Sequence, residues 1–102
     1  MLDLRPNCEL CDTDLPPDSG LARICSYECT FCARCVEDRL DDVCPNCGGG
    51  FQPRPVRPRG EWTSGHGLAH DPPATERRRS RRTPQEIAEL VALLRAIPPA
   101  ER

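Results

Sequence analysis

Eight cysteines within forty residues constrain the fold of this chain more than any other feature. They form three C-x-x-C pairs, CELC, CARC and CPNC, and one looser pair, CSYEC. Two thiolates at the C-x-x-C spacing lie on one tight turn and bind a single tetrahedral Zn(II) ion. Four such pairs supply two closed four-cysteine sites and leave no position open for a catalytic water. The predicted zinc ligands are Cys8, Cys11, Cys25, Cys29, Cys32, Cys35, Cys44 and Cys47.

The composition also favours a core that is held together by metal. Only 37% of the 102 residues are hydrophobic, and small chains of this kind need staples. No secretory signal precedes the first cysteine, and no run approaches the roughly 20 apolar residues of a membrane helix. We therefore expect a cytoplasmic protein without membrane contact, where clustered thiols bind metal more often than they form disulfides. Iron in the same sites is an alternative that would colour the protein.

The spacing of the cysteines leaves the pairing of the zinc ligands open. Sequential pairing would join the first four cysteines on one ion and the last four on the other. Interleaved pairing would join the first and third pairs on one ion, and the second and fourth pairs on the other. Only two residues separate Cys29 from Cys32, so these two either share an ion or turn away from each other toward two ions.

The order of the gaps between cysteines, two, thirteen, three, two, two, eight and two, resembles the ligand pattern of RING fingers. Cys29 stands where that family usually has His. The stretch CARCVEDRLDDVCPNC also resembles the part of a RING finger in which a short helix separates C-x-x-C from C-P-x-C. This resemblance covers residues 8–47, and it implies a RING-like or treble-clef cross-brace in which the ligand pairs interleave.

The RING resemblance also implies a function, recruitment of a ubiquitin-conjugating type of enzyme. In that family an apolar residue in the first C-x-x-C and another on the short helix bind the partner, and Leu10 and Leu40 stand at these positions. The basic residue that often follows the last cysteine is Gly48 here. Because apolar residues are scarce in this chain, Leu10 and Leu40 are equally well read as core residues.

A second resemblance covers more of the chain. The stretches MLDLRPNCELCDTDLPPDS, RICSYECTFCARC and VCPNCGG, followed by RPVRP and PATERR, resemble a family of small bacterial eight-cysteine proteins of unknown function. The likeness extends from Met1 to about Arg78. It implies zinc binding in a bacterial cytoplasm and supplies no activity.

Three parts are predicted along the chain: a zinc-binding domain (1–52), a flexible Pro- and Arg-rich linker (53–83) and an amphipathic helix (84–97). The linker composition cannot offset its ordering entropy by burial. Thr83, followed by Pro84 and Glu86, has the pattern of a capping box. The apolar face of the helix needs a partner, which is the zinc domain, a second copy of the chain or another protein. That face consists of Ile87, Leu90, Val91 and Leu94.

Charge divides the chain into an acidic half and a basic half. Residues 1–50 carry ten acidic residues and four arginines, whereas residues 51–102 carry six acidic residues and ten arginines. Two four-thiolate zinc sites would lower the charge of the first half to about −10, which repels a phosphate backbone. The stretch ERRRSRR (76–82) favours a nucleic-acid partner by charge, but no aromatic residue is interleaved to stack on bases. Its other reading is a solvated segment that folds back on the acidic domain.

The remaining side chains indicate no catalytic centre. His66 and His70 have a zinc-ligand spacing, but the glycines around them disfavour a helix. All eight thiols are assigned to metal, so no nucleophile is left. Tyr27, Phe31 and Phe51 are predicted to form the small core, and Trp62 is either a docking anchor for a partner or a residue that folds onto the zinc domain. We expect a non-enzymatic adaptor with two Zn(II) ions that binds another protein.

Overall fold

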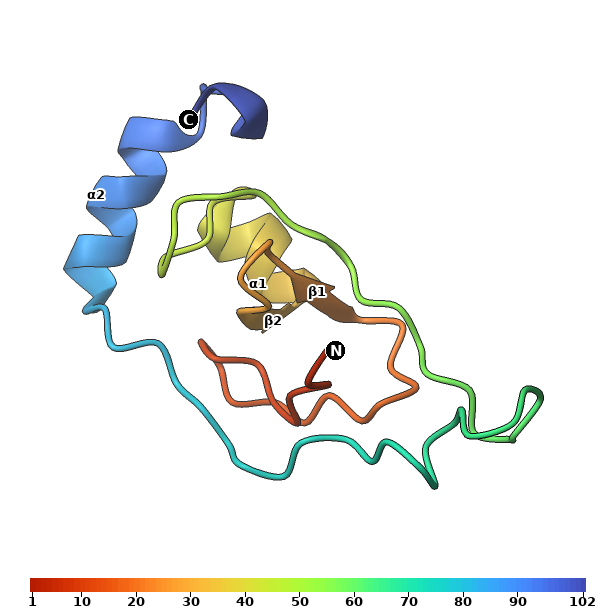
Figure 1. Cartoon of the computed structure of the whole chain (residues 1–102). Coiled ribbons are helices and arrows are strands. Elements are labelled where there is room, and N and C mark those ends of the chain that lie inside the picture. The colour runs from red at the N-terminus through yellow and green to blue at the C-terminus, as the bar shows by residue number, and fades with distance from the viewer.

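The computed structural model describes residues 1–102 and contains little regular secondary structure. Figure 1 shows a small sheet and short helical turns at the centre, with the C-terminal helix and long connections around them. No helix combines the length and the apolar character that crossing a membrane would require. The elements are β1 (Ala22–Ile24), β2 (Thr30–Cys32), α1 (Ala33–Cys35), η1 (Val36–Leu40), β3 (Gln52–Pro53), α2 (Pro84–Leu94) and η2 (Pro99–Glu101).

The sheet is antiparallel, with the strand order β2-β1-β3. Arg23 of β1 lies opposite Phe31 of β2 and opposite Pro53 of β3. Strand β3 is at an edge, where a proline is tolerated because its missing N–H removes no ladder bond from a central strand. The loop between β1 and β2 is closed by the Cys25 N–H, which donates to the Cys29 carbonyl at 3.2 Å. The looser CSYEC pair is therefore a hairpin loop.

Strand β2 leads directly into two helical turns. The Sγ of Cys32 caps α1 by accepting a hydrogen bond from the Cys35 N–H at 3.5 Å. The π-helical turn η1 follows and ends at Asp41, whose φ of 47° is left-handed. This path places Cys32 and Cys35 on one turn, with both thiols facing inward.

Cysteines make up almost half of the core. Thirteen buried residues form one cluster, and six of them are cysteines. Phe31 and Phe51 meet at its centre in an edge-to-face pair with ring centroids 5.4 Å apart. Tyr27 lies on the exposed hairpin loop with 73% of its surface accessible, so the prediction that it joins the core is wrong. Because this core has few aliphatic and aromatic side chains, its stability depends on what binds the thiols.

Helix α2 begins where the capping pattern predicts. The Thr83 Oγ1 accepts from the Glu86 N–H at 3.1 Å, and the Thr83 N–H donates to the Glu86 carboxylate at 3.0 Å. The helix ends at Leu94 and not at Ile97. Residues 95–97 form a turn before the two prolines, which cannot continue a helix.

The apolar face of α2 packs on residues 1–52 of the same chain, which we call the cysteine unit. Ile87 is buried in the core cluster, and Val91 packs against that cluster. The Leu94 methyl group lies so close to Gly48 that a Cβ there would be 3.2 Å away. The sequence allows three partners for this face, and in the structure the face packs on one of them, the chain's own cysteine unit.

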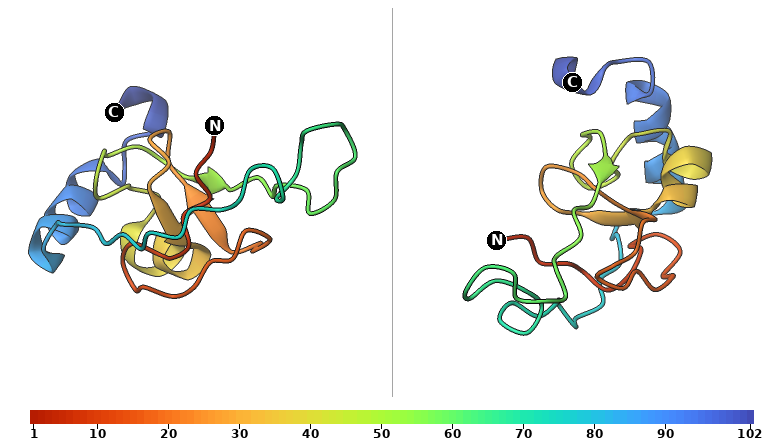
Figure 2. Two further views of the ribbon diagram at one scale, coloured as in Figure 1. Left: turned by 60° about the horizontal axis from the view of Figure 1, so that its bottom comes forward. Right: turned by 90° about the vertical axis from the view of Figure 1, so that its right-hand side faces the viewer.

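Residues 58–71 form a loop that projects from the body of the molecule (Figure 2). The base of the loop is closed by the Leu68 N–H, which donates to the Pro58 carbonyl at 2.9 Å. Arg57 adds a bond from its guanidinium group to the Asp71 carbonyl at 2.8 Å. Trp62 lies on this loop with 87% of its surface exposed. Trp62 therefore does not fold onto the cysteine unit, and its role as a docking anchor stays a prediction.

The rest of the predicted linker lies against the cysteine unit. Arg54 is only 4% exposed, and its guanidinium group donates to the carbonyls of Arg5, Leu15 and Pro16 at 2.8 to 3.3 Å. The Ala74 N–H donates to the Asp3 carbonyl at 2.9 Å. The predicted flexibility of residues 53–83 stays a prediction, but in this structure the segment makes specific contacts at several points.

Candidate metal centre

The first cysteine group combines two C-x-x-C turns that are far apart in sequence. The Sγ atoms of Cys8, Cys11, Cys32 and Cys35 all lie within 4.8 Å of one another. Cys11 and Cys32 approach to 3.8 Å. The N-terminal turn before β1 and the start of α1 thus meet around one point. Three of the four residues are buried, and Cys11 is exposed at the edge.

The second cysteine group combines the hairpin loop with the CPNC turn. The Sγ atoms of Cys25, Cys44 and Cys47 lie within 4.8 Å of one another. Cys29 falls outside that limit, but its thiol lies close enough to Cys25 and Cys44 to shift the pKa of both. All eight cysteines therefore fall into two groups, and the grouping is interleaved along the sequence. None of them forms a disulfide.

Strand β2 explains why Cys29 and Cys32 belong to different groups. Cys29 immediately precedes the strand, and Cys32 is its last residue. A strand advances about 3.3 Å per residue, so three residues separate the two positions by roughly 10 Å. Successive side chains also alternate between the faces of a strand, so an odd separation directs the two thiols to opposite sides. Neither thiol can reach the group of the other.

Mutual hydrogen bonds and burial perturb the thiol pKa values within both groups. Hydrogen bonds from the Cys29 and Cys44 thiols lower the pKa of Cys25 to about 3. Hydrogen bonds with the Cys25 and Cys29 thiols raise the pKa of Cys44, and burial is the main cause of the raised pKa of Cys35. Without a cation, some thiols in each group keep their protons so that a neighbouring thiolate is stabilised. Full ionisation needs a positive charge at the centre, which is what a soft divalent metal ion supplies.

Glu9 connects the two cysteine groups. Its side chain is only 5% exposed. One carboxylate oxygen accepts from the Thr30 N–H at 2.6 Å and from Arg5 at 3.3 Å, and the other accepts from the Asn46 amide at 3.2 Å. Because Glu9 lies within the CELC turn and Asn46 within the CPNC turn, this carboxylate joins a turn of the first group to a turn of the second.

Residues 76–82, which we call the arginine segment, bind to the same two turns. The Ser80 N–H donates to the Glu9 carbonyl at 2.8 Å, and the Ser80 hydroxyl donates to the Asn46 Oδ1 at 2.8 Å. The guanidinium group of Arg77 pairs with Asp14 at 2.7 Å and with Asp12 at 3.0 Å. The segment therefore folds back on the acidic cysteine unit, as the second sequence reading proposed.

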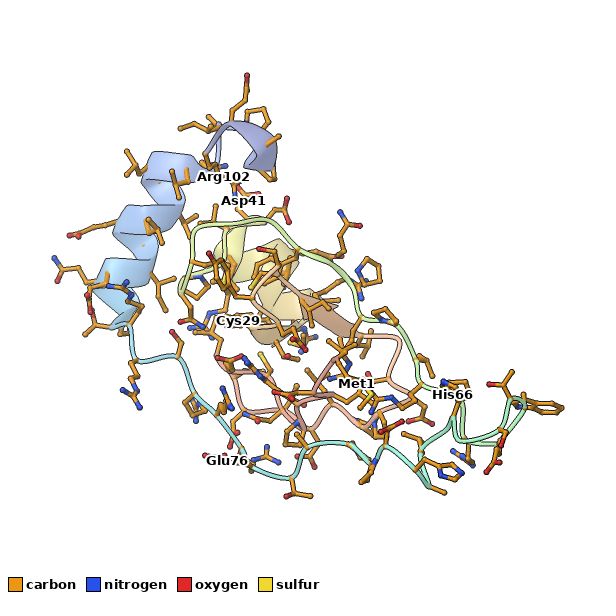
Figure 3. All side chains as sticks on the ribbon, in the orientation of Figure 1. Met1, Cys29, Asp41, His66, Glu76 and Arg102 are labelled. Carbon is orange, nitrogen blue, oxygen red and sulfur yellow. The ribbon has the colours of Figure 1, made fainter.

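The structure separates the other predicted site residues. Leu40 is completely buried, in agreement with its reading as a core residue, and its role in binding a partner stays a prediction. Leu10 is half-buried and packs against the core cluster beside Ile87. The residues of α2 predicted to bind a partner, Leu90, Val91 and Leu94 among them, are partly covered by the cysteine unit. His66 lies on the projecting loop, away from Cys29 (Figure 3).

Sequence reasoning did not identify the polar residues that support the two groups. Glu9 and Asn46 are the variable positions inside C-x-x-C turns, and Asn7 precedes the first of these turns. Nothing in a single sequence indicates that such positions are buried. A weak signal was available for Arg54, because an arginine between two prolines directly after a predicted domain has little freedom to turn away.

Comparisons with known proteins agree with the sequence resemblance to an eight-cysteine family. Residues 1–57 match the model of the family described as "Protein of unknown function (DUF1272)". The matched part ends at residue 57 and not near Arg78. An uncharacterised protein of Rhizobium meliloti (strain 1021) is 69% identical over 58 residues, which are 57% of this chain and 69% of that protein. No solved structure matches the chain. Because the family model covers more than half of the residues, the chain belongs to this family of small proteins of unknown function.

Proposed function

We propose that the chain is a non-enzymatic adaptor whose cysteine unit is held together by two Zn(II) ions and presents a surface to a protein partner. The observation that carries the proposal is the interleaved grouping of the thiols, which places four sulfur atoms around one point and three around a second, with Cys29 beside the second group. Zn(II) accepts a closed shell of four thiolates and then serves a structural role. Cys8, Cys11, Cys32 and Cys35 would bind one ion, and Cys25, Cys29, Cys44 and Cys47 the other.

The composition of the core supports a structural role for the metal. Six of the thirteen residues in the core cluster are proposed ligands, so the ions would lie where a larger domain has aliphatic side chains. In domains of this size the free energy of metal binding is largely the free energy of folding. We therefore expect the cysteine unit to unfold when a chelator removes the zinc.

Trp62 supports a protein as the partner. A large aromatic side chain that is 87% exposed on a loop with a closed base is a suitable anchor for an apolar pocket on another protein. The alternatives have weaker support. A RING-type recruiter would use Leu40, which is buried, and self-association through α2 would use an apolar face that already packs on the cysteine unit.

Two measurements test the proposed function. Native mass spectrometry of the purified chain is expected to give two Zn(II) per chain, and a count of one or none would contradict the metal proposal. Affinity purification with the zinc-loaded chain is then expected to recover a protein that Trp62→Ala does not retain. The matched control is Val56→Ala, which truncates another exposed apolar residue. Equal recovery by both variants would contradict Trp62 as the anchor.

A further inference from the structure

A cavity of about 600 Å³ lies between the arginine segment and the turns that carry the cysteines. It is wide enough for a small ligand, since ligand pockets usually measure about 300 to 1,000 Å³. Figure 3 labels two of its lining residues, Cys29 and Glu76. The wall consists of all five arginines of the arginine segment together with Arg5, Glu9, Cys29, Asn46 and Glu76.

The backbone of the arginine segment is fixed at this wall. The buried Asn7 side chain donates to the Arg78 carbonyl at 2.7 Å and accepts from the Arg78 N–H at 3.1 Å. Two residues further on, Ser80 is held by Glu9 and Asn46. The side chain of Arg78 is therefore presented from a backbone position that is already ordered, which lowers the entropy cost of binding a ligand.

The guanidinium groups around the cavity fall into two classes. Arg77 pairs with Asp12 and Asp14, and Arg82 lies 3.6 Å from Glu86. Arg5 pairs with Glu9, and Arg79 donates to a backbone carbonyl. The guanidinium groups of Arg78 and Arg81 have no ion pair and no hydrogen bond, although both residues line the cavity. Two positive charges at the wall are thus left without a partner.

We propose that this cavity binds a small oxyanion with at least two negative charges, of the pyrophosphate class, through Arg78 and Arg81. Guanidinium groups match phosphate oxygens in bidentate geometry. No aromatic residue lines the cavity, so nothing there would stack on a nucleobase. The ligand is therefore recognised by its phosphate groups alone. This inference does not depend on the adaptor role.

The test is a titration of the zinc-loaded full chain with pyrophosphate, in which binding is measured by calorimetry and by NMR of the arginine Nε–H resonances. We expect saturable binding in which the resonances of Arg78 and Arg81 shift. The double variant Arg78→Gln with Arg81→Gln should lose at least about tenfold in affinity, because charge-assisted hydrogen bonds are lost. The matched control, Arg34→Gln with Arg59→Gln, removes the same charge from two exposed positions elsewhere and should bind within about twofold of the parent.

Four results would overturn the proposal. Equal weakening by both double variants, or tighter binding of a single-stranded oligonucleotide than of pyrophosphate, would indicate diffuse attraction to a charged surface. Loss of zinc during the titration would show that pyrophosphate acts as a chelator. Absence of binding, with zinc retained less well by the Arg78 and Arg81 variant, would show that these arginines only balance the charge of the thiolates.

Discussion

The role of Glu9 gives the sharpest prediction about stability. Its buried carboxylate is the only acceptor for the Thr30 N–H and the Asn46 amide, and it is the partner of Arg5, whose side chain is 13% exposed. Glu9→Ala leaves the buried Thr30 N–H and the half-buried Asn46 amide without this acceptor, and Arg5 keeps only the Asp3 carboxylate, 3.9 Å away. Removing one member of a buried ion pair costs about 3 to 5 kcal/mol. We expect a loss of that size, out of the roughly 5 to 15 kcal/mol that stabilises a small domain.

Glu9→Gln is the informative comparison. The amide keeps one oxygen for the Thr30 N–H, and Asn46 can rotate so that its oxygen accepts from the new NH₂ group. The Ser80 hydroxyl, which donates to the Asn46 oxygen, would then accept from the Asn46 amide instead, and the attraction to Arg5 is lost, so we expect a cost of about 1 to 2 kcal/mol. The control is Glu37→Ala, at an exposed carboxylate on η1, which should change stability by less than about 0.5 kcal/mol.

The assay is urea unfolding, monitored by circular dichroism at a fixed excess of free zinc. The zinc concentration is fixed because the apparent stability of a metal-binding protein depends on it. The rate of zinc release to a chromogenic chelator should follow the loss of stability, so that Glu37→Ala releases zinc most slowly, Glu9→Gln faster and Glu9→Ala fastest. A Glu9→Ala variant as stable as the parent would refute the reasoning. So would a Glu9→Gln variant that loses as much stability as Glu9→Ala.

Three further predictions concern the segments that pack on the cysteine unit. Ile87→Asp removes about 1.5 to 3 kcal/mol of apolar burial. The amides of α2 should then exchange rapidly with deuterium, while the amides of the sheet stay protected. Leu93→Asp, at an exposed position, should leave the exchange of both α2 and the sheet unchanged. Thr83→Ala should lower the protection of α2 by about 1 kcal/mol through loss of the N-cap, and full protection in that variant would show that packing alone fixes the helix start. Replacing Asp12 and Asp14 by Asn should let trypsin cleave the arginine segment faster, and an unchanged cleavage rate would mean that these ion pairs do not hold it.

The sequence predicted those parts of the structure that depend on local chemistry. The capping box of α2 is a pattern of four residues, and it is present at Thr83 and Glu86 in the structure. The thiol pairs are also local, because each lies on a single turn or hairpin. The grouping of those pairs required the resemblance to RING fingers, since spacing alone allowed two arrangements. The length of β2 decides between them in physical terms.

Other parts could not be predicted because the contacts join residues far apart in the chain. The arginine segment has no apolar period, and it is held by Asn7, more than seventy positions earlier in the sequence. The composition of such a segment predicts that it is solvated. Composition does not show that another part of the chain offers hydrogen-bond partners for it. The burial of Glu9 has a similar origin, since its carboxylate contacts Thr30 and Asn46, which are 21 and 37 positions away in the sequence.

The central claim is that two metal ions hold the cysteine unit through interleaved ligand pairs. The most direct measurement is NMR of the chain substituted with ¹¹³Cd, in which each metal resonance is correlated with the β-protons of its cysteine ligands. We predict two metal resonances, one correlated with Cys8, Cys11, Cys32 and Cys35 and the other with Cys25, Cys29, Cys44 and Cys47. A single resonance, or correlation of Cys25 and Cys29 with the metal bound by Cys8 and Cys11, would contradict the account.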